Sequence, residues 1–366
     1  MKMTTPSISH LKRFRKTMAE RDIDAALIVG RPGTHWLTGF RGSHSYTLVF
    51  PRSVEFITDS RYIELARKEL RGITVTLQKT PVSDQIEHAL RRHRIQRLGL
   101  EDDISHAEWK WARRLAPKGA RVVDVSAMLR DLRAVKDARE IAAIRRAVSL
   151  TDEMFSDLIP WLRRRMRRVD VTEREIASWI KAEIDARGGE GPSFPPIVAA
   201  GSNSARPHAV PGNRKVRTGQ FLLFDFGLIL DGHCSDMTRT VLIGKGTARH
   251  RHIYETVLKA QRAALDSIRA GMRGAEIDAK ARKIIGDAGH GPHFGHGLGH
   301  GVGVEIHEAP RLAPGVKTPL IAGNVVTVEP GIYMPGFGGV RIEDMVLVKS
   351  GGGEILTTSP KELICL

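Results

Sequence analysis

The sequence predicts an α+β protein with two domains, a smaller mixed α/β domain at residues 1–133 and a larger domain at residues 134–366. Three observations support this fold class. A chain of 366 residues is too long for one ordinary hydrophobic core. Helical and strand-like patterns alternate through residues 1–130, as they do in a mixed α/β domain. After residue 191, glycine, proline and histidine become frequent between strand-like runs, so the second domain differs in composition.

The first domain shows short apolar or β-branched runs that are typical of strands, and a turn at Pro51 separates two of them. One helix is expected over residues 11–18. Another is expected to begin at an Asp59 or Ser60 cap and to end near residue 70. The expected strands are residues 25–29, 45–50, 54–58, 73–77, 97–100 and 121–125.

Two helices are expected at the start of the second domain. The first covers residues 131–155, where apolar residues recur at three- to four-residue spacing, and it links the domains. The second begins after Thr172, which forms a capping-box pattern with Glu175, and it stops at the Gly188-Gly189 pair.

Composition and charge exclude several classes of protein. No apolar run approaches the roughly 20 residues that cross a bilayer, and the basic N-terminus lacks the apolar core of a secretory signal. Cys234 and Cys365 are too few for a disulfide framework or a thiolate zinc site, which favours a reducing, cytoplasmic setting. The net charge is +16, with its densest run at residues 163–168, but only 5% of residues are aromatic. We therefore expect a solvated basic face, no nucleic-acid partner and no membrane partner.

A β-hairpin is predicted around Asp231-Gly232, because this dipeptide favours a two-residue turn between β-prone runs. In that register Asp225 faces Thr238, so Asp225 and Asp236 project from one face with Cβ atoms roughly 7 Å apart or less. Two such carboxylates repel each other unless a cation lies between them or one binds a proton. A metal ion and a salt bridge to Arg239 are both consistent with this pattern.

Further acidic and imidazole groups follow in strand-like or glycine-rich surroundings. Glu329 ends a strand that Pro330 should terminate, and Arg341 and Glu343 share one face of a strand over residues 340–348. The segment "HGLGHGVGVEIHEAP", residues 296–310, places three histidines among closely spaced glycines. Glycine there indicates that the backbone approaches something closely or turns sharply, and a strand is expected over residues 302–308.

In its motifs and their order, the chain resembles the pita-bread metallopeptidases of the Xaa-Pro branch, aminopeptidase P and prolidase, which are related to methionine aminopeptidase. The resemblance implies a C-terminal pita-bread fold and a smaller creatinase-like N-terminal domain. The motifs of the first domain and the linking helix are "WLTGF", "FITDSRY" and "LRAVKDAREIAAIRRA". Those of the catalytic half are "SFPPIVAAGSNSARPHAVPGNRKV", "SDMTRT", "HGLGHGVGVEIHEAP", "VEPGIY" and "VRIEDMVLV".

The resemblance implies five ligands for two divalent metal ions. Asp225 would bind one ion, and His300 and Glu329 would bind the other. Asp236 and Glu343 would bridge the two ions. Four carboxylates and one imidazole form an oxygen-rich site, for which Mn²⁺ is the expected metal and Co²⁺, Fe²⁺ or Zn²⁺ are alternatives. In this interpretation the glycines let the backbone turn His300 towards the ions.

The resemblance also implies roles for other side chains. His208 and His307 would bind substrate and stabilise negative charge, and Glu329 would carry a proton from water to the leaving nitrogen. His296 and Arg341 would contact substrate, although the guanidinium could instead brace the ligand carboxylates.

Some neighbouring residues receive no catalytic role. His290 and His293 are interpreted as ordinary polar residues, and Cys234 as a small buried residue. His233 replaces the aromatic residue that many relatives carry before the "CSDMTRT" motif, which leaves the expected ligands unchanged.

The predicted function is metal-dependent hydrolysis of the bond between an N-terminal residue and proline in a proline-containing peptide. The sequence does not separate aminopeptidase P from prolidase activity, and the interpretation slightly favours the former. The alternatives are a methionine-aminopeptidase-like exopeptidase, another reaction at the same metal centre, and a non-hydrolytic peptide- or nucleic-acid-binding module on this fold. A homodimer is expected from the resemblance alone.

Overall fold

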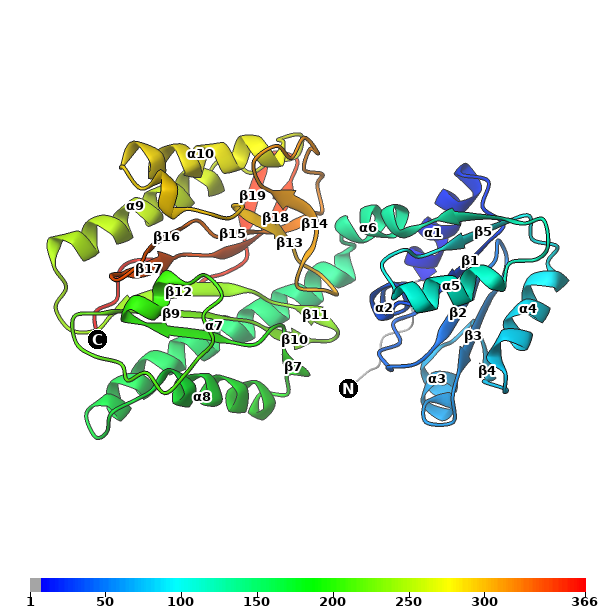
Figure 1. The fold of residues 1–366 in the computed structure, drawn as a ribbon, viewed down its shortest axis with the longest axis horizontal. Coiled ribbons are helices and arrows are strands. Elements are labelled where there is room, and N and C mark those ends of the chain that lie inside the picture. The colour runs from blue at the N-terminus through cyan, green and yellow to red at the C-terminus, as the bar shows by residue number, and fades with distance from the viewer. Residues whose placement is uncertain (1–7) are drawn as a thin grey trace. The chain divides into compact units, whose positions relative to one another are not determined.

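The structure is a computed structural model that describes residues 8–366 (Figure 1). The chain divides between Arg133 and Ala134 into two compact units, called here the smaller and the larger unit. Among the helices of residues 8–366, none is both long and apolar enough to cross a membrane.

The smaller unit is built on a mixed six-stranded sheet with the order β4-β3-β2-β1-β5-β6. Strands β1, β2 and β3 pair antiparallel in sequence, whereas β4, β5 and β6 join the sheet in parallel. The strands are β1 (Ala25–Ile28), β2 (Tyr46–Val49), β3 (Val54–Thr58), β4 (Thr74–Leu77), β5 (Arg97–Leu100) and β6 (Arg121–Asp124). The helices are α1 (Ile8–Glu20), α2 (Arg31–Thr38), α3 (Ile63–Glu69), α4 (Val82–Arg92), α5 (His106–Arg114) and α6 (Ser126–Ala134), which ends at the boundary between the units.

The expected strands of the smaller unit are confirmed, but the expected cap of α3 is wrong. Helix α3 begins at Ile63 with Tyr62 as its N-cap residue. The Asp59 carboxylate instead accepts the backbone N–H of Arg61, and the Asp59 carbonyl accepts the N–H groups of Tyr62 and Ile63. Asp59 therefore closes a turn that precedes the helix.

The larger unit contains four long helices and several small sheets. Its helices are α7 (Ala138–Met166), α8 (Glu173–Ala186), α9 (Ala248–Leu265) and α10 (Gly274–Asp287), with 3-10 turns at Gly201–Ala205 and Gly291–His293. A three-stranded sheet with the order β12-β9-β8 is formed by β8 (Ile197–Ala200), β9 (Phe221–Phe226) and β12 (Met237–Leu242). A small sheet with the order β11-β10-β7 continues it, formed by β7 (Gly191–Pro192), β10 (Leu228–Leu230) and β11 (His233–Cys234).

The C-terminal part of the larger unit adds a five-stranded sheet with the order β14-β13-β15-β18-β19 and a two-stranded ribbon. The sheet is formed by β13 (Gly299–Gly301), β14 (Glu308–Leu312), β15 (Val325–Val328), β18 (Asp344–Lys349) and β19 (Gly352–Ile355). The ribbon consists of β16 (Gly331–Met334) and β17 (Gly338–Arg341).

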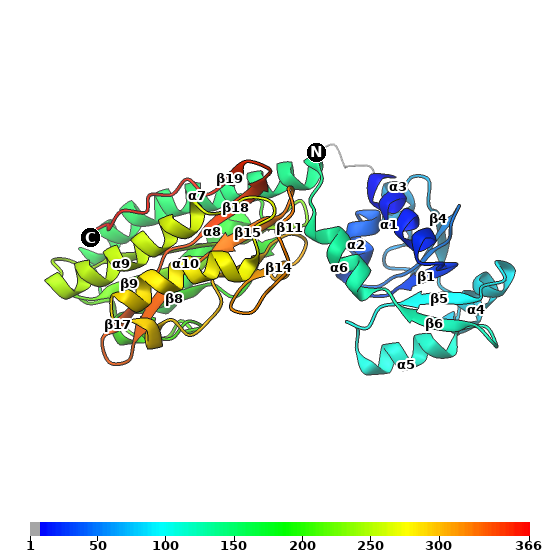
Figure 2. The same cartoon turned by 90° about the horizontal axis from the view of Figure 1, so that it is seen from above.

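Two hydrophobic cores hold these strands between the helix pairs. In one core, α7 and α8 pack through residues such as Phe155 and Ile180 against Leu222 and Phe224 of β9. In the other, apolar side chains of α9 and α10 pack against β15, β17 and β18. Accordingly, α9 and α10 lie side by side on one face of the strands, and α7 and α8 lie on the opposite face (Figures 1 and 2).

Three expected elements of the larger unit are interrupted. The helix expected over residues 131–155 is split, because Asp137 accepts the N–H groups of Arg139 and Glu140 and so caps a new helix, α7. Residues 303–307 form bends, and β14 begins only at Glu308. The strand expected over residues 340–348 breaks after Arg341, where the chain leaves the β16–β17 ribbon to join β15 in another sheet. The capping box of Thr172 and Glu175 is confirmed.

Candidate metal centre

The hairpin that carries the first two acidic residues has the predicted register. Asp225 of β9 pairs with Thr238 of β12, and the turn residues Asp231 and Gly232 both have positive φ, at 50° and 71°. The strands are interrupted at Gly227, where a Cβ atom would lie only 1.8 Å from the carbonyl oxygen of Ser235. This close approach leaves Asp236 immediately before β12, with its side chain buried.

His300 lies in β13, between β14 and β15 of the five-stranded sheet, and faces two acidic residues. Its Nε2 atom is 3.6 Å from Asp236 Oδ2 and 3.3 Å from Glu329 Oε1. Its Nδ1 atom is 3.0 Å from the carbonyl oxygen of Gly301, which can only accept, so Nδ1 carries the hydrogen. The Nε2 lone pair of the neutral ring is therefore directed towards the acidic groups, as a metal ligand requires.

The glycines beside His300 have a different role from the expected one. Neither Gly299 nor Gly301 has positive φ, so they do not turn the backbone. A Cβ atom on Gly299 would lie 2.1 Å from the carbonyl oxygen of Thr327, and one on Gly301 would lie 2.1 Å from that of Ala309. These glycines allow β13 to fit closely between its two neighbouring strands.

Two glutamates reach the same pocket from the ends of neighbouring strands. Glu329 follows β15, and its Oε1 atom accepts the hydroxyl of Thr327 at 3.2 Å. Glu343 lies between β17 and β18, where its Oε2 atom accepts the hydroxyl of Thr238 at 2.6 Å. One ligand atom from each of Asp236, His300 and Glu343 lies within 4.8 Å of the other two, a spacing that one metal ion can span.

The buried guanidinium of Arg341 holds Asp225. It donates to Asp225 Oδ2, to the hydroxyl of Thr238 at 3.0 Å and to the hydroxyl of Tyr333 at 2.7 Å. The alternative salt bridge from the acidic pair to Arg239 is wrong, because Arg239 pairs with Asp344 instead. Of the two roles expected for Arg341, these contacts correspond to bracing a carboxylate.

Burial and mutual repulsion disfavour the charged forms of three of these carboxyl groups. Burial, and then the charge of Glu329, raises the pKa of Asp225, although Arg341 opposes this rise. Burial and the charge of Asp225 raise the pKa of Asp236 well above its ordinary value. Burial and the charges of Asp236, Glu329 and Asp225 do the same for the pKa of Glu343.

Glu329 and His300 pair with each other, and this pairing favours the charged form of both side chains. Burial alone would raise the pKa of Glu329, but the hydrogen bond and charge of His300 lower it. Burial alone would lower the pKa of His300, but its contacts with Glu329 and Asp236 raise it to about 9.

These residues fit divalent metal ions. Four buried carboxyl groups lie together, and the charges of their neighbours raise the pKa values of Asp225, Asp236 and Glu343 although Arg341 opposes this, so added positive charge would stabilise their ionised forms. Asp225 Oδ1 is buried without a hydrogen-bond partner in the described part of the chain, which leaves one acceptor for an ion. Carboxylate oxygens and one imidazole form the kind of donor set that hard divalent cations prefer.

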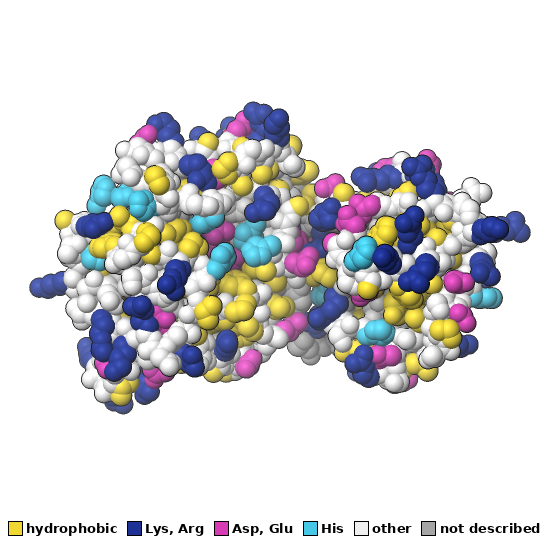
Figure 3. Space-filling model, in the orientation of Figure 1, with side chains coloured by type: hydrophobic (Ala, Val, Ile, Leu, Met, Phe, Trp, Pro, Cys, Tyr) yellow, Lys and Arg dark blue, Asp and Glu magenta, His cyan; other side chains and the backbone are white. Residues whose placement is uncertain are grey.

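The other histidines lie around this pocket. His307 is exposed, and its ring centroid is 4.4 Å from that of His300. His208 is also exposed, and its charge is close enough to lower the pKa values of His296 and His307, after the larger effect of burial. Figure 3 shows histidine and acidic side chains side by side on the face of the larger unit.

His296 is connected to Arg341 through a residue that the sequence analysis missed. His296 Nδ1 donates to the carbonyl oxygen of Gly297 at 2.8 Å, so Nε2 accepts the hydroxyl of Tyr333 at 2.9 Å. Arg341 in turn donates to the Tyr333 oxygen. Tyr333 lies in the strand-like run after "VEP", where its residue type alone predicts only a buried aromatic side chain.

Thr238 and Thr327 were also missed, because a threonine in a strand is ordinary. Their hydroxyl groups orient Glu343 and Glu329. His233 is buried, and its Nδ1 atom donates to the carbonyl oxygen of Asp231 at 2.9 Å. Burial raises the pKa of the neighbouring Cys234 to about 12, so this thiol is no nucleophile near neutral pH.

Comparison with known proteins gives matches over almost the whole chain. Residues 142–350 match metallopeptidase family M24, and residues 10–135 match the creatinase/prolidase N-terminal domain. The chain is 33% identical over 357 residues to an Xaa-Pro dipeptidase of Pyrococcus horikoshii, a match that covers 97% of this chain and 98% of the relative.

Solved structures resemble this one closely. An Xaa-Pro dipeptidase from Bacillus anthracis superimposes with a TM-score of 0.92 at 36% identity, covering 98% of this chain and 99% of that one. An X-Pro aminopeptidase from Thermotoga maritima superimposes with a TM-score of 0.88 at 33% identity, covering 95% and 99% of the two chains.

Proposed function

The chain belongs to metallopeptidase family M24, with a creatinase-like N-terminal domain and a pita-bread C-terminal domain, and on this premise we propose that it hydrolyses the bond between an N-terminal residue and proline. The observation that carries the proposal is the convergence of Asp236, His300 and Glu343 within 4.8 Å of one another, with Glu329 beside His300. Relatives named as Xaa-Pro dipeptidases and an X-Pro aminopeptidase support the substrate class.

We propose two divalent ions, with Mn²⁺ as the expected metal. Asp225 is proposed to bind one ion, His300 and Glu329 the other, and Asp236 and Glu343 both. When bound, such ions polarise the scissile carbonyl group and make water more acidic.

Side chains of the pocket are proposed to transfer the proton, stabilise the developing negative charge and contact the substrate. Glu329 is proposed to take a proton from the attacking water and to give it to the nitrogen that leaves. His307 and His208 are exposed beside this pocket, where their imidazoles can donate to the carbonyl oxygen as it becomes negative. His296 is proposed to contact the substrate, while Arg341 holds Asp225 in one orientation.

The test measures metal content and peptide cleavage on the same sample. Purified protein is assayed with Mn²⁺ and with an Xaa-Pro dipeptide, an Xaa-Pro-Xaa tripeptide and Met-Ala-Ser. Cleavage of either proline peptide, with about two metal ions per chain by elemental analysis, supports the proposal, and the preferred length separates dipeptidase from aminopeptidase activity. Cleavage of Met-Ala-Ser alone would show that the methionine-aminopeptidase alternative is correct.

The cytoplasmic location and the homodimer remain predictions. Fractionation of cells and the mass of the purified protein in solution test them directly.

A further inference from the structure

Arg239 is one of the largest fully buried side chains of the described chain, and its guanidinium hydrogen-bonds to residues of the larger unit. It follows Thr238 in β12 and therefore lies on the opposite face of that strand from Thr238. Its Nη1 atom donates to the carbonyl oxygens of Thr238 and Glu343. The guanidinium thus binds the backbone of two residues whose side chains meet in the metal pocket, 2.6 Å apart at their oxygen atoms.

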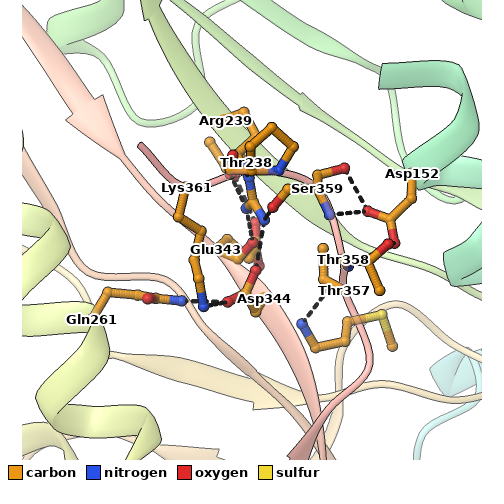
Figure 4. Close-up of polar contacts among 12 residues, drawn as sticks. Asp152, Thr238, Arg239, Gln261, Glu343, Asp344, Thr357, Thr358, Ser359 and Lys361 are labelled. Carbon is orange, nitrogen blue, oxygen red and sulfur yellow. Dashed lines mark hydrogen bonds and ion pairs between the residues drawn. The ribbon is translucent and has the colours of Figure 1, made fainter. Parts of the chain in front are cut away.

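The other nitrogens of Arg239 bind the C-terminal segment and a buried carboxylate (Figure 4). Nη2 donates to Asp344 Oδ1 at 2.7 Å and to the carbonyl oxygen of Ser359 at 2.8 Å, and Nε donates to the carbonyl oxygen of Pro360 at 3.0 Å. The second oxygen of Asp344 accepts Gln261 at 2.8 Å and Lys361 at 2.7 Å. Asp344 directly follows Glu343, so this network holds both sides of the same peptide group.

The C-terminal segment is itself fixed by Asp152 of α7. The Asp152 carboxylate accepts the backbone N–H and the hydroxyl of both Thr358 and Ser359, at 2.5 to 2.9 Å. Tyr254 of α9 donates to the carbonyl oxygen of Lys361 at 2.8 Å. Residues 357–361 are therefore bound by a helix from each side of the larger unit, and we call this segment the strap.

We propose that Arg239 is a positioning residue for Glu343, and that the strap holds Arg239 in place. The proposal rests on the proposed function in one respect, because it takes Glu343 as a metal ligand. The Glu343 carboxylate is oriented by Thr238, and the Glu343 backbone is oriented by Arg239 together with the 3.1 Å hydrogen bond from Glu343 N to the Thr238 carbonyl oxygen. A displaced guanidinium would let the Glu343 peptide group move relative to β12.

A network that served only to stabilise the fold would affect unfolding stability and not metal affinity. A buried ion pair adds little net stability compared with well-packed apolar side chains, so stability alone does not explain a guanidinium at this point. Groups that orient the ligands of a metal typically change metal affinity by roughly 10- to 100-fold when they are altered. The two roles can therefore be separated by comparing metal affinity with unfolding stability.

The experiment titrates the full-length metal-free protein with Mn²⁺ by calorimetry and with Co²⁺ by visible absorption. The variants are Arg239→Lys, which shortens the reach of the donor, and Asp152→Asn, which loosens the strap without touching the pocket. The matched control is Asp170→Asn, which removes the exposed pairs of Asp170 with Lys215 and Arg217. Thermal unfolding of every metal-free variant is measured in parallel.

The expected result is that Arg239→Lys weakens binding of at least one ion by roughly 10- to 100-fold and alters the Co²⁺ spectrum. Asp152→Asn should weaken binding in the same direction by a smaller factor, and Asp170→Asn should not change it. Saturating Mn²⁺ should restore most of kcat in both variants. If Arg239→Lys does not fold, Asp152→Asn alone decides the question.

Unchanged metal affinity in a folded Arg239→Lys protein, or in Asp152→Asn when Arg239→Lys does not fold, would overturn the positioning role while leaving peptide hydrolysis intact. A wild-type protein that binds two ions but cleaves no proline peptide would instead overturn the proposed function, and the affinities would still decide the role of Arg239. A wild-type protein that binds no divalent ion would overturn both.

Discussion

Lys136 Nζ lies 2.9 Å from Glu308 Oε2, and both side chains are almost completely buried in the larger unit. The other Glu308 oxygen accepts the backbone N–H of Glu305 at 3.0 Å, so Glu308 holds both ends of the bend that carries His307. The backbone N–H of Lys136 donates to the carbonyl oxygen of Gly323 at 2.9 Å. The ion pair therefore ties the segment before α7 to the segment beside the metal pocket.

Lys136→Met should lower the free energy of unfolding of the larger unit by about 3–5 kcal/mol, because it removes the ammonium group that pairs with the buried Glu308 carboxylate. Urea unfolding at neutral pH measures this change. Lys136→Met combined with Glu308→Leu should recover part of the loss. Lys283→Met removes an exposed pair with Asp287 and should change stability by about 1 kcal/mol or less. An equal effect of the two lysine variants would contradict this view of the buried pair.

Divalent metal should stabilise the protein as well as activate it, because it relieves the repulsion among Asp225, Asp236 and Glu343. We expect protein treated with EDTA to unfold at a lower temperature and Mn²⁺ to raise the free energy of unfolding by about 3 kcal/mol at 100 times its dissociation constant. Asp236→Asn should bind less metal and show a smaller rise. Calorimetry with and without Mn²⁺ provides the measurement, and a stability that ignores Mn²⁺ would argue against the site.

His307→Ala should lower kcat by roughly 10²- to 10³-fold, because it removes a donor beside the developing negative charge. Metal content and unfolding temperature should remain unchanged, since the side chain is exposed and is not a proposed ligand. His290→Ala is the matched control and should retain full kcat. Steady-state kinetics with a proline peptide distinguishes these outcomes, and loss of metal from His307→Ala would point to a different role.

Glu101 should make the smaller unit less stable as the pH rises. Burial raises the pKa of Glu101 from 4.5 to about 7, although its carboxylate accepts the N–H groups of Val29 and Gly30. Between these pH values the folded chain binds the proton that the unfolded chain has lost, so stability falls with rising pH. The loss should reach roughly 3 kcal/mol above pH 7.

Glu101→Gln keeps the shape of the side chain and should flatten this pH dependence. Exposed Glu64→Gln, in the same unit, should leave it unchanged. Chemical unfolding followed between pH 5 and 8 provides the comparison. A wild-type protein whose stability is constant over this range would refute the assignment to Glu101.

Hairpin register was the part of the metal centre that could be derived from the residues alone. A two-residue turn fixes the pairing of the strands, and this placed Asp225 opposite Thr238 as the structure has it. The positions of His300, Glu329 and Glu343 relative to that hairpin depend on strands distant in sequence, so the residues alone could not supply them. The resemblance to a known family supplied those expectations instead.

The two strand predictions that the structure interrupts share a physical cause. Residues 340–348 and the hairpin strands contain uninterrupted β-prone runs, but the chain changes from one sheet to another at Ile342 and at Gly227. Such a change is determined by the strands available for pairing, not by local propensity. The sequence analysis identifies neither α9 nor α10. Spacing alone also does not show which of the many acidic residues binds Arg239.

Pairing of residues 364–366, which follow the strap, with β12 has a consequence for the order of events during synthesis. Leu242 N donates to the carbonyl oxygen of Ile364, and Leu366 N donates to that of Leu242. The hydrogen bonds of β12 can therefore be completed only after these residues, which are translated much later, have been made. The six-stranded sheet of the smaller unit, in contrast, is complete in sequence at Asp124. We therefore expect the smaller unit to resist protease while the nascent chain is still attached to the ribosome. The larger unit should become resistant only after residues 364–366 have emerged.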